Sequence, residues 1–153
     1  MPNASDKVQA ITDTVNRYIE LLAKGSADEL AELYADDATV EDPVGGEVHI
    51  GRQAIHGFYS AVNDVQRECE LVSLRVAGSE AAFQFRLTVI AGEHRMMIEP
   101  IDVMVFDDRG EGHRHEGLLV GRRRHPGLAS GGVADVKNGE PHGDIVQNRR
   151  DRR

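Results

Sequence analysis

Two aspartates stand in contrasting surroundings that could separate an acid from a base. Asp102 lies in the apolar run PIDVMVF, whereas Asp42 closes the strand-like run ATVE and precedes a proline. Burial disfavours the charged form of a carboxyl group, so we expect Asp102 to keep its proton unless a cation neutralises it. We expect the partly hydrated Asp42 to be ionised near neutral pH. A neutral acid can donate a hydrogen bond and an ionised acid can accept a proton, so the pair is suited to proton transfer.

Each aspartate also has a purely structural interpretation. Asp102 could form a salt bridge with Arg75, Arg86 or Arg95, and this alternative has about the same weight as the chemical one. Asp42 could serve only the turn that follows it, which is common for an aspartate before proline.

Three helices are predicted in the first part of the chain. Apolar residues recur at spacings of three and four from residue 8 to residue 22, and Gly25 ends that pattern. Ser26 and Glu29 form a capping box that opens a second helix, and a third helix is predicted after Gly51.

The only tyrosines of the chain are Tyr18, Tyr34 and Tyr59, and each falls on the apolar side of one of these predicted helices. Phenol hydroxyls buried there need hydrogen-bond partners. Taken singly, a tyrosine at such a position is more often a core residue with a satisfied hydroxyl than a catalytic one.

The pattern changes to strands after the helices. Strand-like runs cover residues 38 to 43, 68 to 76, 80 to 90 and 94 to 108. Apolar residues flank Asp102 in both directions, so we expect both faces of its strand to be buried. Helices followed by antiparallel strands indicate an α+β fold, in which the helices cover one face of a curved sheet.

Composition indicates one domain with a tail of different character. Residues 1 to 111 carry 9 Lys and Arg against 21 Asp and Glu, or −12, whereas residues 112 to 153 carry 9 against 5, or +4. The tail is basic and rich in glycine and arginine, and disorder is its default because it has little apolar surface to bury. A nucleic-acid-binding arm is the alternative, but the tail has no aromatic residues and the body is acidic, so we expect no nucleic-acid partner.

Other classes of protein are disfavoured. With a single cysteine there is no intrachain disulfide, the start lacks the features of a secretory signal, and no run approaches the ~20 apolar residues of a membrane span. We therefore expect a cytoplasmic protein with no membrane partner. His49, His56 and His94 are scattered and the remaining histidines lie in the tail, without metal-ligand spacing. The acidic neighbours of Cys69 should raise the pKa of its thiol and so oppose a nucleophilic role.

Four segments together resemble bacterial ketosteroid isomerase. They are RYIELLAKG (17 to 25), ELYADDATVEDPVG (32 to 45), IHGFY (55 to 59) and EPIDVMVFDDRG (99 to 110). The resemblance runs through about residues 8 to 111. Within the wider superfamily of conical domains similar to nuclear transport factor 2 and SnoaL, the joint presence of Tyr18, Asp42 and Asp102 separates the isomerase.

The resemblance implies a fold and a mechanism. The fold is a cone of three N-terminal helices on a curved, mainly antiparallel sheet, in a homodimer without metal or organic cofactor. Asp42 would be the base that moves a proton on a 3-oxosteroid. Tyr18 and protonated Asp102 would donate hydrogen bonds to the dienolate oxygen. In this enzyme class the surroundings give the two aspartates different pKa values, so that one is ionised and the other keeps its proton. Tyr34 and Tyr59 would support Tyr18. Apolar side chains are expected to line a pocket for a flat hydrocarbon: Val40, Phe58, Val65, Phe83, Phe85, Met97 and Met104.

The resemblance ends after Glu111. The family has a final strand there, but this chain continues EGHRHEGLLVGRRRHPG, so we expect that strand to be altered or missing. Permitted codons for residues 112 to 126, read one nucleotide later, spell VTGMKAYWSADDVT, which is similar to the family's strand. We hypothesise that a single-nucleotide frameshift replaced the C-terminus, and the codons of the gene would decide it.

The function implied is a steroid Δ-isomerase that moves a double bond from Δ5 to Δ4. Two alternatives stay open. One is another reaction on the same fold, by a hydratase, epoxide hydrolase or cyclase, although such reactions do not require Asp102 beside Tyr18. The other is a small-molecule binding module whose catalysis is impaired by the altered C-terminus.

Overall fold

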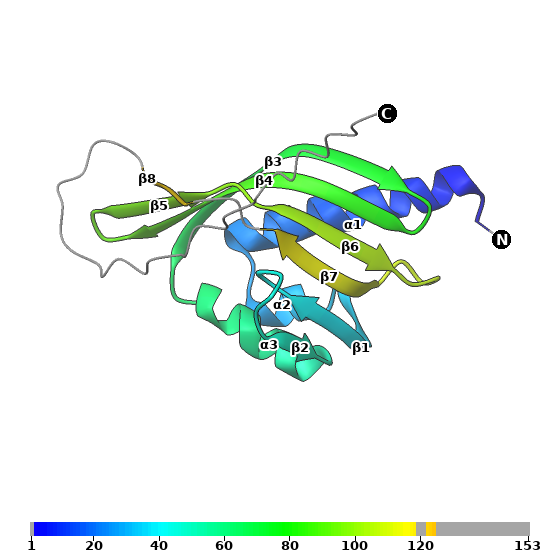
Figure 1. The fold of residues 1–153 in the computed structure, drawn as a ribbon, viewed down its shortest axis with the longest axis horizontal. Coiled ribbons are helices and arrows are strands. Elements are labelled where there is room, and N and C mark those ends of the chain that lie inside the picture. Colours follow the sequence, from blue (N-terminus) through cyan, green and yellow to red (C-terminus); the bar gives the residue numbers. More distant parts are fainter. Residues whose placement is uncertain (1, 119–121, 125–153) are drawn as a thin grey trace, which may run out of the picture.

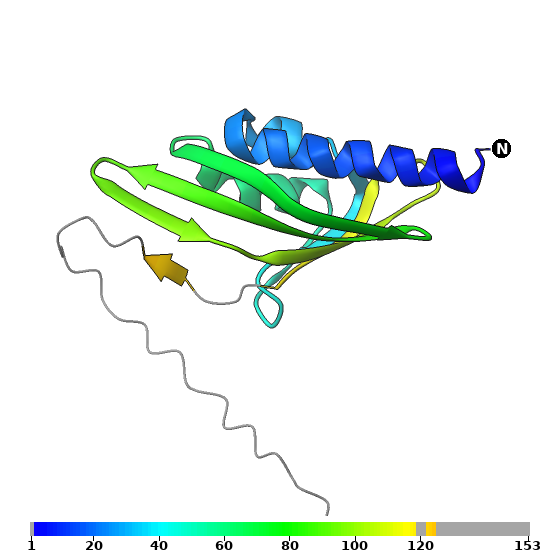
Figure 2. The same ribbon diagram turned by 90° about the horizontal axis from the view of Figure 1, so that it is seen from above.

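The fold is a curved sheet with one long helix across its face. A computed structural model describes residues 2–118 and 122–124. Helix α1 (Ala4–Lys24) lies over the sheet, and α2 (Ala27–Ala31), α3 (Arg52–Tyr59) and the short 3-10 helix η1 (Ser60–Val62) lie near one edge of it (Figures 1 and 2). No helix in these ranges is long and apolar enough to cross a bilayer.

Helix α1 is held at both of its ends by specific contacts. Asn3 caps its start in a capping box with Asp6. At its end, the backbone N–H of Gly25 donates to the carbonyl oxygen of Leu21 at 2.7 Å. The guanidinium of Arg67, on the neighbouring strand β3 (Gln66–Ala77), donates to the carbonyl oxygens of Leu22 at 2.6 Å and Gly25 at 2.7 Å. These contacts satisfy carbonyl groups that the helix itself leaves open.

The capping box of Ser26 and Glu29 begins α2, and α3 begins after Gly51, so both predicted helix starts are confirmed. Gly51 has a φ of 86°, a backbone conformation that glycine adopts without strain.

In the described part of the chain, eight strands form the sheet in the order β2-β1-β7-β6-β4-β5-β8, with β3 paired to β4. Their bounds are Tyr34–Glu41 (β1), Val48–Ile50 (β2), Gln66–Ala77 (β3), Glu80–Ala91 (β4), His94–Ile98 (β5), Ile101–Phe106 (β6), Gly112–Leu118 (β7) and Arg122–Arg124 (β8). The pair β1 and β7 is parallel and the other pairs are antiparallel. The predicted α+β class and mainly antiparallel sheet are confirmed.

Two element predictions are wrong in detail. Tyr34 was expected on the second helix, but it begins β1, where it pairs with Gly112 of β7. The run from 94 to 108 was expected to be one strand, but Glu99 and Pro100 divide it into β5 and β6. Proline has no N–H to donate to a sheet, so it interrupts the hydrogen-bond ladder.

Strand β6 buries one face, not two. On one face Asp102, Met104 and Phe106 are buried. On the other face Ile101 is 40% exposed and Val103 and Val105 are half-buried. The prediction that both faces are buried is therefore wrong, because none of the helices within residues 2–118 covers the outer face of the sheet (Figure 2).

The chain after Glu111 differs from the expected tail. Residues 112–118 form β7, which pairs with β6 on one side and β1 on the other. Backbone pairing does not depend on side-chain type, and both neighbouring strands would otherwise expose unpaired N–H and C=O groups. A strand therefore closes the sheet at this position. Most of the predicted tail, residues 119–121 and 125–153, lies outside the described residues.

Candidate active site

The strand register places two predicted site residues in one row across the sheet. Asp102 of β6 pairs with Phe83 of β4 on one side and with Gly117 of β7 on the other. Beyond Gly117, Val44 donates its N–H to the Gly117 carbonyl oxygen at 2.9 Å, so the segment that holds Asp42 lies beside this residue. The row runs Phe83, Asp102, Gly117, Asp42.

The adjacent row supplies the residue that joins the site together. Met104 pairs with His115 of β7, and His115 pairs with Val40 of β1. Alternation puts positions 115 and 117 on the same face of β7, the one towards the core. His115 is therefore a diagonal neighbour of Asp102 beneath α1.

Asp42 sits at the border of the core. A Cβ atom on Gly117 would overlap the carboxylate of Asp42, so this carboxylate fills the space above a residue without a side chain. Burial raises the pKa of the Asp42 carboxyl, the charge of Asp102 raises it further, and His115 and His49 lower it. Because one strand separates the two aspartates, their backbones are about 10 Å apart.

Three phenols from three elements form a chain of hydroxyl groups. Tyr18 is on α1, Tyr59 on α3 and Tyr34 on β1. Tyr59 Oη lies 3.3 Å from Tyr18 Oη and 2.7 Å from Tyr34 Oη. Burial is the main cause that raises the pKa of all three phenols, so each keeps its proton at neutral pH.

His115 connects this chain to Asp102. Its Nδ1 lies 2.6 Å from Tyr34 Oη and its Nε2 lies 2.6 Å from Asp102 Oδ2. Both Asp102 and His115 have no exposed surface. The second carboxyl oxygen, Asp102 Oδ1, is buried and has no hydrogen-bond partner among the described residues.

The salt-bridge interpretation of Asp102 is wrong. Arg86 pairs with Glu99, and Arg95 pairs with Glu68. Arg75 donates to the carbonyl oxygen of Leu74. The predicted burial of Asp102 is confirmed, and its partner is the imidazole of His115.

Sequence reasoning missed His115 because it lies in the segment that was assigned to the tail. The one available indication of a strand was that His113, His115 and Gly117 occupy alternate positions. This indication is weak without knowledge of the neighbouring strands.

Most of the predicted apolar lining surrounds these groups. The Tyr18 ring contacts Phe83, Phe85 and His115 edge to face, with ring centroids 5.8, 6.2 and 5.2 Å away. Val40 and Met104 are fully buried, and Phe58 is half-buried against Tyr59. Two predicted lining residues are not brought into this cluster: Val65 and Met97 are partly exposed and stand outside the core.

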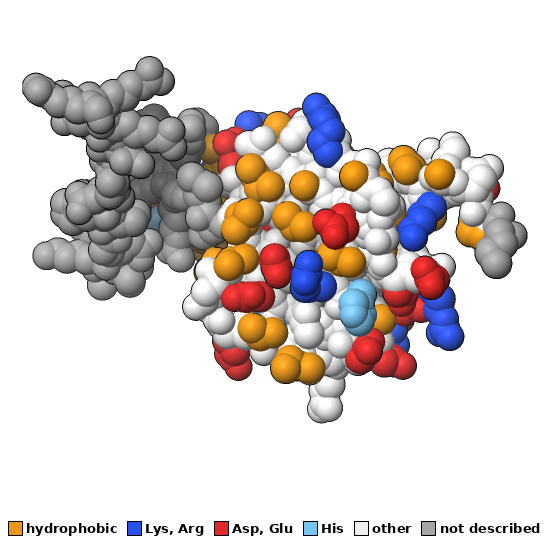
Figure 3. Space-filling model, turned by 45° about the vertical axis from the view of Figure 1, so that its right-hand side comes forward, with side chains coloured by type: hydrophobic (Ala, Val, Ile, Leu, Met, Phe, Trp, Pro, Cys, Tyr) orange, Lys and Arg blue, Asp and Glu red, His pale blue; other side chains and the backbone are white. Residues whose placement is uncertain are grey.

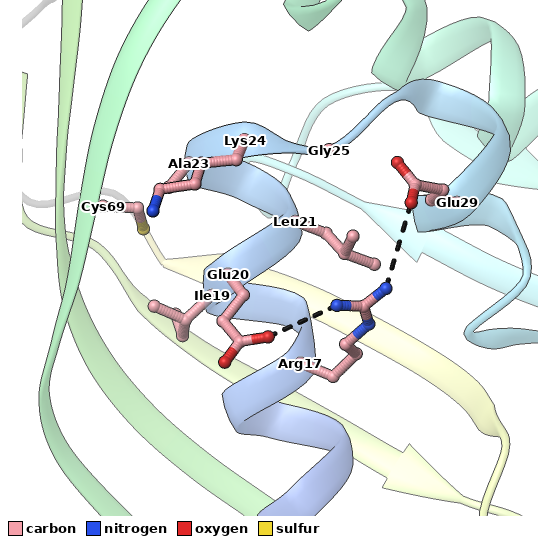
Figure 4. Close-up of a pocket in the computed structure, with 9 residues that line it drawn as sticks. All are labelled: Arg17, Ile19, Glu20, Leu21, Ala23, Lys24, Gly25, Glu29 and Cys69. Atoms are coloured by element: carbon pink, nitrogen blue, oxygen red, sulfur yellow. Dashed lines mark hydrogen bonds and ion pairs between the residues drawn. The ribbon is translucent and has the colours of Figure 1, made fainter.

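A groove of about 430 Å³ lies elsewhere, beside the C-terminal part of α1 (Figure 4). Arg17 spans it, pairing with Glu20 at 3.3 Å and Glu29 at 3.9 Å. Cys69 reaches its edge, where burial raises the pKa of the thiol to about 12. The predicted rise in this pKa is confirmed, although burial and not the acidic neighbours is the leading cause. None of the predicted site residues lines this groove.

Comparison with known proteins places these features in a family. The SnoaL-like domain profile matches residues 15–112, ending where the composition changes. A steroid Delta-isomerase of Nocardioides simplex is 46% identical over 97 residues, which are 63% of this chain and 79% of that protein. The structure of SalBIII, an epoxide hydrolase/cyclase-like enzyme of pyran ring formation in the polyether salinomycin, has a TM-score of 0.68 over 74% of this chain and 92% of that one. At 22% identity, the second likeness shows the fold alone. The profile match over most of the described residues shows that the chain belongs to the SnoaL-like domain family.

Proposed function

We propose that this protein is a steroid Δ-isomerase that converts Δ5-3-oxosteroids to their conjugated Δ4 isomers. The 46% identity to a steroid Delta-isomerase supports this reaction. The observation that carries the proposal is the row formed by Asp102, Gly117 and Asp42, with Tyr18 above the same face of the sheet.

The proposed reaction is an internal proton transfer. The carboxylate of Asp42 removes a proton from the carbon between the ketone and the double bond, and the electrons of that C–H bond form a dienolate. The resulting carboxylic acid returns the proton two carbons further along the dienolate, and the double bond becomes conjugated with the ketone. No electron or atom is gained or lost overall, so the residues of the chain suffice for each step.

Tyr18 is the donor that we assign to the dienolate oxygen. Its hydroxyl accepts a hydrogen bond from Tyr59, which leaves its own proton available. A donor fixed in a dry site stabilises charge that develops in the transition state. The resemblance gives Asp102 a second donor role, but here Asp102 Oδ2 already faces His115. Tyr18 is therefore the principal donor in this chain.

The position of Asp42 suits a base. Burial raises the pKa of the Asp42 carboxyl towards neutral pH, so its carboxylate is a stronger base than that of an exposed aspartate. Its contact with the backbone at Gly117 holds the carboxylate towards the inner face.

The test is conversion of 5-androstene-3,17-dione to its conjugated isomer, followed by ultraviolet absorbance. We expect the wild-type chain to convert the steroid and Asp42→Asn to be slower by about 10² to 10⁴. Asp64→Asn is the matched control, because this exposed aspartate lies in a surface turn. Equal rates for wild type and Asp42→Asn would remove Asp42 as the base. Binding of the steroid without conversion by the wild type would favour the binding module over the isomerase.

The likeness to SalBIII, which shows the fold alone, does not favour a different reaction.

We further propose that the protein is a homodimer joined through the outer face of the sheet. Val72, Ile101 and Leu118 on the strands of this face are 47%, 40% and 44% exposed. Figure 3, which turns the view of Figure 1 by 45°, shows hydrophobic side chains interspersed with acidic and basic ones on the face of the molecule that it presents. Exposed apolar area of this kind favours association. Sedimentation should give a dimer for the wild type and a monomer for Ile101→Lys, and a monomeric wild type would refute the assembly.

A reducing compartment such as the cytoplasm is the location that we propose, on the basis of the single free cysteine.

A further inference from the structure

The hydrogen bonds among the buried polar groups can be assigned a direction, because each phenol has a single proton. Tyr59 Oη donates to Tyr18 Oη at 3.3 Å, so the proton of Tyr59 is already used. In its 2.7 Å contact with Tyr34, Tyr59 must therefore accept. The proton of Tyr34 is then used as well, so in the 2.6 Å contact with His115 Nδ1 the imidazole N–H donates to Tyr34.

The other ring nitrogen determines where the proton of Asp102 lies. His115 Nε2 and Asp102 Oδ2 are 2.6 Å apart, which requires one proton between them. With Nδ1 protonated, this proton belongs either to a neutral Asp102 that donates to Nε2 or to an imidazolium that donates to a carboxylate. In both cases Asp102 Oδ1 carries no proton. It is the oxygen that is buried without a partner in the described part of the chain.

We infer that His115 is a positioning residue that directs these hydrogen bonds one way, from its own Nδ1–H through Tyr34 and Tyr59 to Tyr18, and leaves the Tyr18 proton as the one available to a ligand oxygen. Asp102 then acts on the ligand through His115, Tyr34 and Tyr59, and does not donate to it directly. The effect of His115 on catalysis rests on the proposed isomerase function, whereas the direction of the hydrogen bonds does not.

The arrangement has a physical advantage for binding an oxyanion. Hydrogen bonds that point the same way polarise one another, so each donor strengthens the next along the chain. Negative charge on a ligand oxygen at Tyr18 would be stabilised by the whole series, which is shielded from water because its members are at most 3% exposed. The opposite direction would use the Tyr18 proton for Tyr59 and leave the ligand oxygen without this donor.

The protonation of His115 can be measured without any steroid. In the full chain labelled with ¹⁵N in its histidine rings, we expect a protonated Nδ1 at His115. Among the described histidines only His115 is buried, so its ring N–H should exchange slowly with solvent and identify the signal without a variant. An unprotonated Nδ1 would make Tyr34 the donor to it, reverse the chain and overturn the inference.

The three tyrosines give a second readout, because they are the only ones in the sequence and all belong to this chain. With ¹³C at the phenol carbon, His115→Phe should shift the signals of all three tyrosines, and His94→Phe, an exposed matched control, should shift none. A shift confined to Tyr34 would show that the groups are not coupled and would contradict the inference.

Steady-state kinetics separate this inference from the proposed function. We expect His115→Phe to lower kcat about tenfold, the effect of one weakened hydrogen bond in the transition state, with KM little changed. A wild type without isomerase activity would refute the proposed function, and the labelled spectra would still decide the direction. A protonated Nε2 with an unprotonated Nδ1, in a fully active wild type, would refute the inference and leave the isomerase standing. Should His115→Phe not fold, the wild-type nitrogen spectrum decides alone.

Discussion

The carboxylate of Asp42 rests against Gly117, in the space that a side chain at position 117 would occupy. Asp42 follows β1 and Gly117 lies in β7, so residues 75 positions apart in the sequence define the placement of the proposed base. The absence of a side chain on one strand gives room to a functional group on the next.

Gly117→Ala should therefore displace the base without changing its chemistry. The added methyl group overlaps the Asp42 carboxylate, and a shift of about 1 Å in a reacting group can cost about 100-fold in rate. We expect kcat for steroid isomerisation to fall by that order, with steroid binding largely kept. Gly57→Ala is the matched control, because a Cβ there meets no atom within 4 Å. Unchanged kcat in Gly117→Ala would show that Asp42 is not held by this contact.

The pH dependence of the reaction should report on Asp42. The base must be ionised, so the rate rises as pH rises through the pKa of Asp42, which burial and Asp102 hold above its ordinary value of 3.8. The electrostatic interaction with His49 lowers the pKa of Asp42, so His49→Gln should raise it and move the acid limb of kcat/KM to higher pH. A shift to lower pH would have the wrong sign for this interaction. His56→Gln, which contacts Asp28 at the surface, should leave the limb in place.

Tyr59→Phe should destabilise the fold. Tyr34 donates to the hydroxyl that this variant removes, and the buried donor then has no acceptor at that position. Such a loss costs about 1 to 3 kcal/mol in the free energy of unfolding, measured by urea denaturation. Removal of the donor to Tyr18 should lower kcat as well. Phe58→Leu serves as a comparison on the same helix, since it changes an aromatic contact and no hydrogen bond.

Arg67→Met should destabilise the junction between α1 and β3. Arg67 is 9% exposed, and its guanidinium donates to two carbonyl oxygens at the end of α1. Hydrogen bonds from a charged donor contribute about 1.5 to 3 kcal/mol each, so we expect a loss in that range or above in urea denaturation. Arg75→Met, at an exposed position on the same strand, should change stability by less than about 0.5 kcal/mol. Equal effects of the two variants would contradict the capping role of Arg67.

Truncation tests where the folded domain ends. A chain of residues 1–124 keeps every described strand and should retain the circular dichroism spectrum and the cooperative unfolding of the full chain. A chain of residues 1–111 lacks β7, which leaves β1 and β6 unpaired along one side, and should not unfold cooperatively. A stable, cooperative 1–111 fragment would restore the boundary predicted from composition.

The sequence by itself determined much of the fold and named most of the candidate site. The apolar spacing of α1, the capping box at Ser26 and the alternation in β4 are local signals, and local signals are readable because backbone geometry fixes which side chains share a face. The apolar neighbours of Asp102 also sufficed to predict its burial. The resemblance in four segments carried the roles of Tyr18 and Asp42, which remain proposals.

Only the tertiary structure decided what Asp102 contacts. From their composition, residues 112–118 were predicted to belong to the tail. They form a strand between β1 and β6, because the backbone groups of both strands need hydrogen-bond partners. This pairing brings together residues that are distant in the sequence. That register puts His115 beside Asp102 and Gly117 beside Asp42. The partner of a buried polar group is a property of the assembled sheet, because it depends on which strand lies next to which and in what register.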